Sequence, residues 1–240
     1  MPPEKLILLL NDYLGAMTNE VVETEGILDK YIGDAIMAFW GNPFCKGNHA
    51  LYACKTAIAM QNKLAELRPV WKKENRPEIN ARIGISTGDM FVGNLGSEHT
   101  RDYTCLGDTV NYGSRLESLN KHYGTKIIID FFTRSQADQG IEVRELDTVV
   151  VKGRVNGTPI FELIGEQGEL TSEKQNLISL YEEALKKYRE GLFMDASEKF
   201  SNILESFPND TPSKVLKKRC KHYISTPPKD WIGVHEMDQK

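Results

Sequence analysis

Apolar residues recur at helical spacing in two long stretches of the N-terminal half. In each stretch they stand three or four positions apart, which gathers their side chains on one face of a helix. The second stretch has many small residues, which indicates close packing against a sheet. The pattern predicts two amphipathic helices, with apolar positions Leu6, Leu9, Leu10, Tyr13, Leu14, Met17 and Val21 in the first and Ala50, Ala53, Cys54, Ala57, Met60, Leu64 and Leu67 in the second.

Between these helices, residues 27–43 have the pattern of a β-hairpin. Two apolar segments meet at Gly33-Asp34, and a Gly-Asp pair between apolar runs is typical of a tight turn. Lys30 and Asp34 lie at opposite ends of this turn in otherwise apolar sequence. The ordinary explanation is a turn aspartate and a solvated lysine, but matching motifs further along the chain favour a functional role.

The pattern up to Gly165 combines short apolar runs with one more helix. That helix is predicted from Thr109 to His122, and Gly124 is a residue type that commonly ends a helix. Strands and helices that alternate with hairpins favour an α+β fold, in which helices cover a mostly antiparallel sheet. The predicted strands are Ile79–Ser86, Met90–Val92, Lys126–Ile129, Val143–Val151 and Ile160–Ile164.

The composition changes after Gly165, which divides the chain into a first domain, 1–165, and a helical extension, 166–240. The extension fits either one tetratricopeptide-like helical hairpin or a plain amphipathic helix pair, and its tail from Ser225 is predicted to be irregular. A single repeat rarely stands alone, so we expect it to pack on the first domain or on a second subunit. Its apolar positions are Leu180, Tyr181, Ala184, Tyr188, Gly191, Phe193, Ala196, Phe200, Ile203 and Pro208.

Length, charge and cysteine usage narrow the function classes. The 240 residues allow one good-sized domain and a small appendage. A net charge of −4 argues against nucleic-acid binding. The four cysteines lack the spacing of zinc or disulfide frameworks, which favours reduced thiols in the cytoplasm. No apolar run approaches the roughly 20 residues that span a bilayer, so no membrane contact is expected from these residues, while an upstream membrane or sensor segment stays open.

Three motifs follow one another along the chain: the hairpin run 27–43, the glycine-containing run 84–96, and the run 101–117 with its Gly-Asp-Thr-Val-Asn-x-x-x-Arg string. Together they resemble the catalytic domain of the class III nucleotidyl cyclases, from about Glu4 to Leu163. The resemblance implies a ferredoxin-like cyclase fold. In that family a strand with a Phe-x-Asp-Ile-x-Gly-Phe-Thr-like segment precedes the first helix and lies in the middle of the sheet, and residues 1–240 do not contain this segment.

The resemblance implies metal and phosphate contacts. Asp34 corresponds to one of two aspartates that bridge a pair of Mg²⁺ or Mn²⁺ ions, hard cations that prefer oxygen ligands. Its partner belongs to the absent strand, so these residues are expected to bind the metal pair poorly. Lys152 or Arg154 is implied to contact the outer phosphates, with a solvated loop as the alternative. Asp89 stands where some members have a phosphate-binding arginine, which puts that contact in doubt.

The resemblance also implies how the base is chosen. Lys30 and Thr104 match positions at which adenylyl cyclases contact adenine: a lysine donates to N1, and a threonine hydroxyl accepts from the exocyclic amine. Guanylyl cyclases have glutamate and cysteine there, and Cys105 is one residue out of that register. The Lys/Thr pair points to the subgroup that includes the bicarbonate-responsive soluble enzymes.

Asn111 and Arg115 are four residues apart on the predicted helix 109–122, hence on one face. The resemblance implies that Asn111 orients the ribose and that Arg115 stabilises charge on the transferring phosphate.

The implied function is conversion of ATP to cyclic AMP and pyrophosphate, by metal-assisted attack of the ribose 3′-oxygen on the α-phosphate. Because one chain carries both sets of site residues, a homodimer with two equivalent sites is expected. Residues 1–240 alone are expected to be weakly active or inactive, with altered association covering the vacant sheet position. The alternatives are a guanylyl cyclase, a non-catalytic nucleotide-binding or dimerisation module, and an interaction protein that holds a protein partner through its C-terminal helices.

Overall fold

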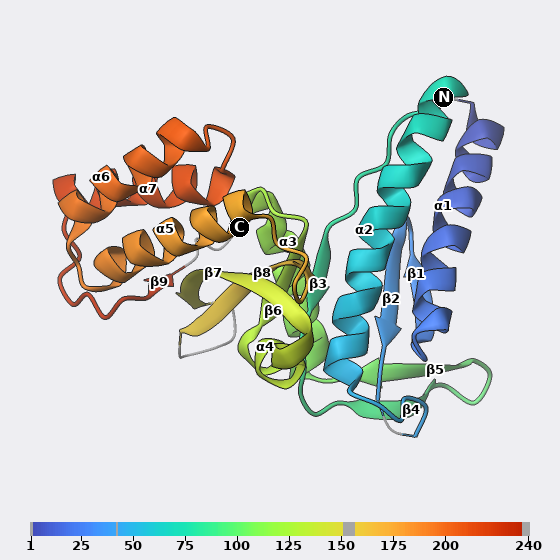
Figure 1. The fold of residues 1–240 in the computed structure, drawn as a ribbon. Coiled ribbons are helices and arrows are strands. Elements are labelled where there is room, and N and C mark those ends of the chain that lie inside the picture. Colours follow the sequence, from blue (N-terminus) through green and yellow to red (C-terminus); the bar gives the residue numbers. More distant parts are fainter. Residues whose placement is uncertain (1, 42, 151–156, 237–240) are drawn as a thin grey trace.

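A computed structural model describes residues 2–41, 43–150 and 157–236. Two long helices, α1 (Pro3–Glu23) and α2 (His49–Lys73), flank a hairpin of β1 (Ile27–Ile32) and β2 (Ala35–Phe39) (Figure 1). Gly33 has a φ of +64°, a left-handed conformation that glycine adopts without strain. The two predicted helices and the predicted hairpin are confirmed.

A five-stranded sheet forms the middle of the molecule (Figure 1). Both inner pairings, of β8 with β6 and with β7, are antiparallel, whereas the outer pairings β3–β6 and β7–β9 are parallel. The strands in sheet order are β3 (Ile83–Ile85), β6 (Ile127–Asp130), β8 (Thr158–Glu166), β7 (Ile141–Val150) and β9 (His235–Glu236). Together with the flanking helices, this arrangement confirms the predicted α+β fold.

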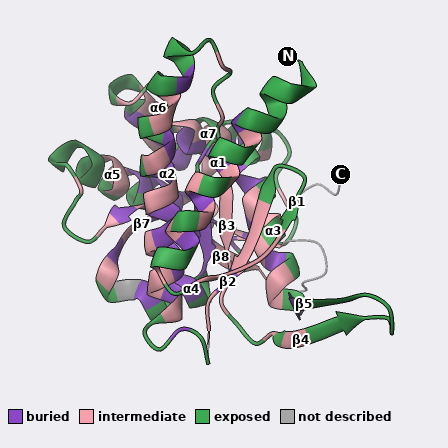
Figure 2. Cartoon of the chain, turned by 90° about the vertical axis from the view of Figure 1, so that its right-hand side faces the viewer, coloured by how far each residue is buried: buried purple, intermediate pink, exposed green. Residues whose placement is uncertain are grey.

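The two faces of this sheet bury different helices. Ile127 and Ile129 of β6 pack toward α2 and α4 (Phe131–Ala137), whereas Ile128 between them packs toward α3 (Asp108–Tyr123). This division follows from the alternation of side chains along a strand. Figure 2 shows the buried residues gathered where these helices meet the sheet. A 3₁₀ turn, Asp138–Gly140, connects α4 to β7.

Helix α3 lies directly against strand β3. A Cβ atom at Gly84 would stand 2.2 Å from the Glu117 nitrogen and 2.2 Å from the Gly113 oxygen, so only glycine permits this approach. The buried Asn120 side chain adds a hydrogen bond from its amide to the Ile83 oxygen, at 2.9 Å. These contacts fix the helix whose first turns carry two of the predicted site residues.

Gly84→Ala is therefore expected to cost about 1–3 kcal/mol of unfolding free energy, because the added methyl group forces the helix and strand apart. Gly15→Ala in α1 is the matched control: nothing lies within 4 Å of its Cβ position, and alanine is the better helix former. Chemical denaturation of both variants measures the difference. Equal stability of the two would contradict the close approach.

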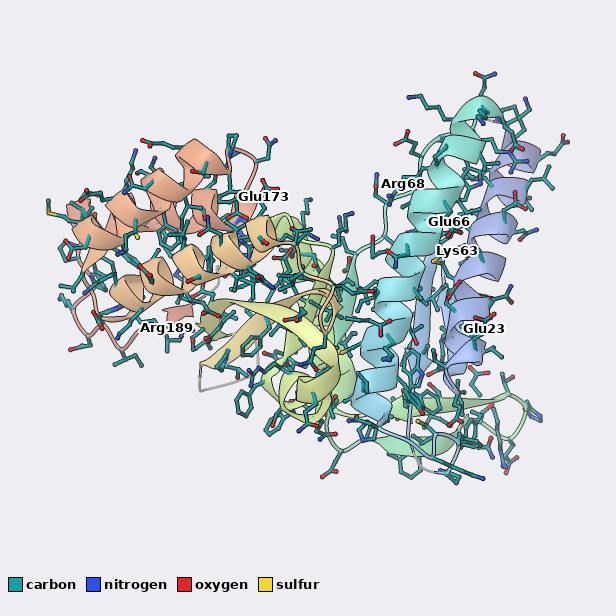
Figure 3. All side chains as sticks on the ribbon, viewed as in Figure 1. Glu23, Lys63, Glu66, Arg68, Glu173 and Arg189 are labelled. Carbon is teal, nitrogen blue, oxygen red and sulfur yellow. The ribbon has the colours of Figure 1, made fainter. Side chains whose placement is uncertain are left out.

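The predicted strand Ile79–Ser86 is shorter in the structure because α2 binds its first residues. Arg68 donates to the Ile79 oxygen at 3.1 Å, and Gln61 donates to the Ala81 oxygen at 2.9 Å, so these carbonyls are not free to pair in a sheet. Arg68 is labelled in Figure 3 on the side of α2 that faces this segment.

Strands β4 (Phe91–Gly96) and β5 (Arg101–Leu106) form a separate antiparallel ribbon. Its residues are mostly exposed, and the ribbon projects from the body of the molecule (Figure 2). Among the described strands, β2 pairs with β1 alone and β3 pairs with β6 alone. The hairpin and the central sheet therefore each present an unpaired strand edge.

Among the described residues, three helices follow β8, where the sequence pattern indicated a pair (Figure 1). They are α5 (Ser172–Arg189), α6 (Phe193–Ser206) and α7 (Thr211–Ser225). Helix α7 has few fully buried apolar positions, Leu216 and Cys220, so its apolar pattern is weak. The tetratricopeptide-like assignment stays a prediction. The tail expected to be irregular includes the short strand β9.

The helical extension packs on the first domain through a buried polar network. Asp147 of β7 is fully buried and forms an ion pair with Arg219 of α7. Tyr123 at the end of α3 donates to Asp147 at 2.7 Å, and Arg219 also donates to the Tyr188 hydroxyl at 3.2 Å. One aspartate thus joins the sheet, α3 and α7.

A second set of contacts supports the same junction. Arg144 of β7 pairs with Glu162 at 2.6 Å and with Asp210, the residue that caps α7, at 2.7 Å. Tyr181 of α5 donates to the Leu146 oxygen at 2.9 Å. The expected packing of the extension on the first domain is therefore observed.

Candidate functional site

Lys30 and Thr104 are 74 positions apart in sequence and in contact in the structure. Strand β1 lies beside β5, and the Lys30 ammonium donates a hydrogen bond to the Thr104 hydroxyl at 3.1 Å. The Lys30 side chain is 38% exposed, whereas Thr104 is buried. The pair therefore presents a cation at the surface above a hydroxyl that lies deeper.

Asp29 completes this cluster, and sequence reasoning did not single it out. Its side chain is fully buried, accepts from the Thr104 hydroxyl at 2.6 Å and lies 3.3 Å from the Lys30 ammonium. Burial opposes ionisation, but the hydrogen bonds from Thr104 and the Cys105 amide and the nearby Lys30 charge outweigh it, so the pKa of Asp29 is lowered. A carboxylate beside Lys30, in a strand whose other residues are apolar or aromatic, was the signal that could have found it.

Cys105 follows Thr104 and contacts Asp29 as well. Burial, and then the Asp29 charge, raise the pKa of the Cys105 thiol to about 11. The thiol is therefore protonated at neutral pH. All four cysteines are free.

Helix α3, which carries Asn111 and Arg115, contacts β5, the strand of Thr104. Asn111 lies in the first turn and is exposed. One terminal nitrogen of Arg115, Nη1, is buried and has no hydrogen-bond partner among the described residues. A buried guanidinium nitrogen without a partner is costly unless a ligand supplies an acceptor. Arg115 is thus suited to receive an anionic group.

Asp34 lies at the tip of the β1–β2 hairpin and is exposed. Burial, and after it the charge of Asp34, raise the pKa of Tyr13 on α1. Within the described ranges, no three or more His, Cys, Asp or Glu residues gather as a metal ligand set. The donor set of these residues therefore does not fit a metal pair without further ligands.

The two candidate phosphate contacts, Lys152 and Arg154, lie outside the described residues. Asp89 is described: its backbone oxygen accepts from the Thr109 hydroxyl at 3.1 Å, which ties the loop after β3 to the start of α3. The structure gives Asp89 a role in holding this loop.

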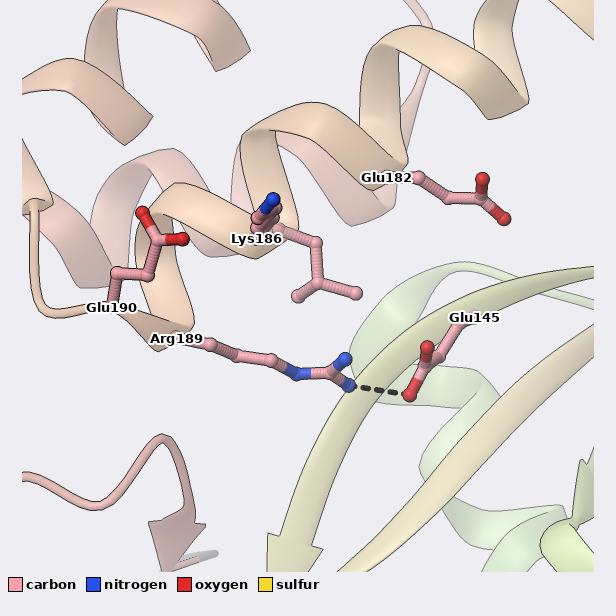
Figure 4. Close-up of a pocket in the computed structure, with 6 residues that line it drawn as sticks. Glu145, Glu182, Lys186, Arg189 and Glu190 are labelled. Carbon is pink, nitrogen blue, oxygen red and sulfur yellow. Dashed lines mark hydrogen bonds and ion pairs between the residues drawn. The ribbon is translucent and has the colours of Figure 1, made fainter.

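A pocket lies away from this site, between α5 and β7 (Figure 4). Arg189 pairs with Glu145 across it, and burial and the Glu145 charge raise the pKa of Glu182. The lining residues are Glu145, Glu182, Leu185, Lys186, Arg189 and Glu190. None of the site residues predicted from the sequence is among them. No described helix combines the length and apolar composition needed to cross a bilayer.

Residues 1–165 match the family described as the adenylate and guanylate cyclase catalytic domain. The terminal-differentiation-specific adenylate cyclase of Dictyostelium discoideum is 33% identical over 227 residues, which cover 93% of this chain and 11% of that protein. The similarity to that protein thus continues into the helical extension. The chain spans 33% or less of the length of the first curated relatives it matches.

Two solved structures resemble this chain equally well. The adenylyl cyclase CyaB from P. aeruginosa has a TM-score of 0.64 at 32% identity, covering 71% of this chain and 88% of that one. A guanylyl cyclase has a TM-score of 0.64 at 30% identity, covering 71% of this chain and 86% of that one. The overall fold therefore does not distinguish an adenylyl cyclase from a guanylyl cyclase.

Proposed function

The chain belongs to the adenylate and guanylate cyclase catalytic domain family, and we propose that it is the catalytic part of an adenylyl cyclase that converts ATP to cyclic AMP and pyrophosphate. The observation that carries the choice of ATP is the hydrogen bond between Lys30 and Thr104. Lys30 donates to adenine N1, and the Thr104 hydroxyl accepts from the exocyclic amine. This pair also supports placement in the Lys/Thr subgroup. The free cysteines fit a reducing compartment such as the cytoplasm.

In this proposal α3 serves the sugar and phosphate. Asn111 orients the ribose, and Arg115 stabilises the charge that develops on the α-phosphate as the ribose 3′-oxygen attacks. The unpartnered nitrogen of Arg115 supports this role, because a fixed cation that waits for an acceptor needs no rearrangement during the reaction.

Metal ions, Mg²⁺ or Mn²⁺, supply Lewis-acid chemistry in this family, and we propose that Asp34 contributes one carboxylate to their site. The second carboxylate comes from a segment that residues 1–240 do not contain. For these residues by themselves we therefore propose weak or no cyclase activity. We assign Lys152 or Arg154 to the outer phosphates.

We further propose that the catalytic unit is a homodimer. Large apolar side chains are exposed on the projecting ribbon, namely Phe91, Leu95, Tyr103 and Leu106. Such a patch supports coverage by a second subunit. The packing of the extension on the first domain favours a structural role for α5–α7 over the alternative of an independent platform for a protein partner.

Lys30→Glu combined with Thr104→Cys tests the assignment of the base. In a chain extended by the upstream strand of a relative, this double substitution is expected to lower the preference for ATP over GTP about tenfold or more, because both base-edge contacts change polarity. Initial rates of cyclic AMP and cyclic GMP formation, measured side by side, give the ratio.

Lys121→Glu on α3, an exposed lysine away from the cluster, is the control for the added negative charge. A preference for GTP in the unsubstituted extended chain would overturn the assignment. An unchanged ratio in the double variant would show that other residues read the base.

A further inference from the structure

We propose that Asp29 is a specificity-determining positioning residue, which holds the Thr104 hydroxyl as a hydrogen-bond acceptor toward the nucleotide base and thereby selects adenine over guanine. The inference rests on the proposed function, because it takes Lys30 and Thr104 as the residues that contact the base. Asp29 acts through these two residues and does not touch the base itself.

The backbone of β1 turns Asp29 toward Thr104. Neighbouring side chains of a regular strand point to opposite faces, so residues 29 and 30 would not reach one hydroxyl. The register of β1 against β2 shifts between Leu28 and Lys30, which makes Asp29 the extra residue of a bulge. A bulge redirects a side chain. Asp29 therefore lies 2.6 Å and Lys30 lies 3.1 Å from the same oxygen of Thr104.

The hydrogen bonds of Thr104 can be counted. A threonine hydroxyl has one hydrogen to donate and two lone pairs that accept. Its hydrogen goes to Asp29, and the Lys30 ammonium occupies one lone pair. One acceptor position is left for a ligand. The Lys30 ammonium has three hydrogens, so it keeps donors for the same ligand.

Asp29 is itself held in place. The Cys105 amide donates to it at 3.3 Å, and the Lys30 ammonium stands 3.3 Å from its second oxygen. Its lowered pKa keeps it ionised at neutral pH, and an ionised carboxylate can only accept. The Thr104 hydroxyl therefore cannot reverse its direction while Asp29 is present.

The Lys30 donor and the Thr104 acceptor together match the hydrogen-bonding edge of adenine and not that of guanine. Adenine presents an acceptor, N1, beside a donor, the exocyclic amine. Guanine presents a donor, N1–H, beside an acceptor, O6. Against guanine, Lys30 meets a donor and the fixed Thr104 hydroxyl meets an acceptor, and such mismatched buried groups are strongly rejected. Without Asp29 the hydroxyl could rotate and donate to O6, so Asp29 supplies the element that excludes guanine.

The test measures binding of N-methylanthraniloyl-ATP and N-methylanthraniloyl-GTP to the 240-residue chain by fluorescence titration, since this label sits on the ribose and leaves the base edge free. The variants are Asp29→Ala, Thr104→Val and their combination. Asp102→Ala removes an exposed carboxylate two residues from Thr104 and is the matched control. Circular dichroism and thermal unfolding verify that each variant is folded.

We expect the unsubstituted chain to prefer the ATP probe about tenfold or more, and Asp29→Ala to reduce this preference about tenfold by gaining affinity for the GTP probe. In the Thr104→Val background, Asp29→Ala should change the preference no further. Asp29→Asn separates the two contacts: its oxygen can still accept from the Cys105 amide and Thr104, while its amide group faces Lys30. This variant should keep the exclusion of GTP and weaken binding of ATP.

A folded Asp29→Ala variant with an unchanged preference, or one that shifts the preference equally without the Thr104 hydroxyl, would overturn the role of Asp29 and leave the proposed function standing. If Asp29→Ala does not fold, an unchanged preference in the folded Thr104→Val variant overturns it, because Asp29 acts on the base through the Thr104 hydroxyl. A preference of the unsubstituted chain for the GTP probe, or binding of neither probe, would count against the proposed function itself.

Discussion

Fusion of the upstream strand of a relative to residues 1–240 is expected to raise the rate of cyclic AMP formation about 100-fold or more, which corresponds to about 2.7 kcal/mol of activation free energy. In the proposed function, the strand would add a second metal-bridging aspartate beside Asp34. Metal ions held by carboxylates lower such barriers by several kcal/mol, and one carboxylate binds Mg²⁺ weakly.

We expect this strand to pair with two strand edges that are free among the described residues. Strands β2 and β3 each have one partner among the described residues, so each offers one free edge. An added strand between them would join the hairpin to the central sheet and would cover unpaired backbone groups. It would also fix the hairpin tip, and with it Asp34, relative to α3.

A version of the fused strand with its aspartate changed to asparagine separates these two contributions. It should raise the thermal unfolding temperature as much as the unchanged strand does, and it should leave the activity low. The assay measures cyclic AMP with ATP and either Mg²⁺ or Mn²⁺. Activity of the unextended chain within about tenfold of the extended one, a difference of about 1.4 kcal/mol, would show that the strand is dispensable and that Asp34 is wrongly placed.

Asp147→Ala is expected to destabilise the chain by about 3–5 kcal/mol, because it leaves the buried Arg219 charge without its counter-ion. Arg219 is 8% exposed, so water cannot take the place of the carboxylate. The Tyr123 hydroxyl loses its acceptor in the same variant. Urea denaturation, with the extrapolated free energy of unfolding as the readout, measures the effect.

Two further variants make this result specific. Glu183→Ala breaks the exposed pair of Glu183 with Lys199 and should cost about 0–1 kcal/mol, since solvent screens that pair. Asp147→Leu combined with Arg219→Met removes both charges and should recover most of the loss. A loss of less than about 1 kcal/mol for Asp147→Ala would contradict the buried network.

The helices and the hairpin were predictable because their signals are local. The spacing of apolar residues in 6–21 and 50–67 is a property of short windows, and a glycine with positive φ marks the turn at Gly33. The length of β3 was not predictable, since it depends on bonds from Arg68 and Gln61 on another element. The bounds of helix α7 were not predictable from the sequence, because few of its side chains are both apolar and buried.

The candidate site divides in the same way. Lys30, Thr104, Asn111 and Arg115 stand in motifs that can be read along the chain, although their roles remain proposals. Asp29 depends on a bulge, and the register of a strand pair is decided by both strands together. Asp147 and Arg219 lie 72 positions apart, and no local pattern relates them.

The junction of α7 with α3 and β7 determines where a chimaera between two enzymes of this family should be spliced. A chimaera spliced at Gly165 would contain Asp147 and Tyr123 but not Arg219. The buried carboxylate of Asp147 would then lack the ion pair that it forms in this chain. A splice point beyond Glu236 moves the network whole. A segment exchanged between such enzymes should therefore extend beyond residues 1–165, which match the family, and include α7.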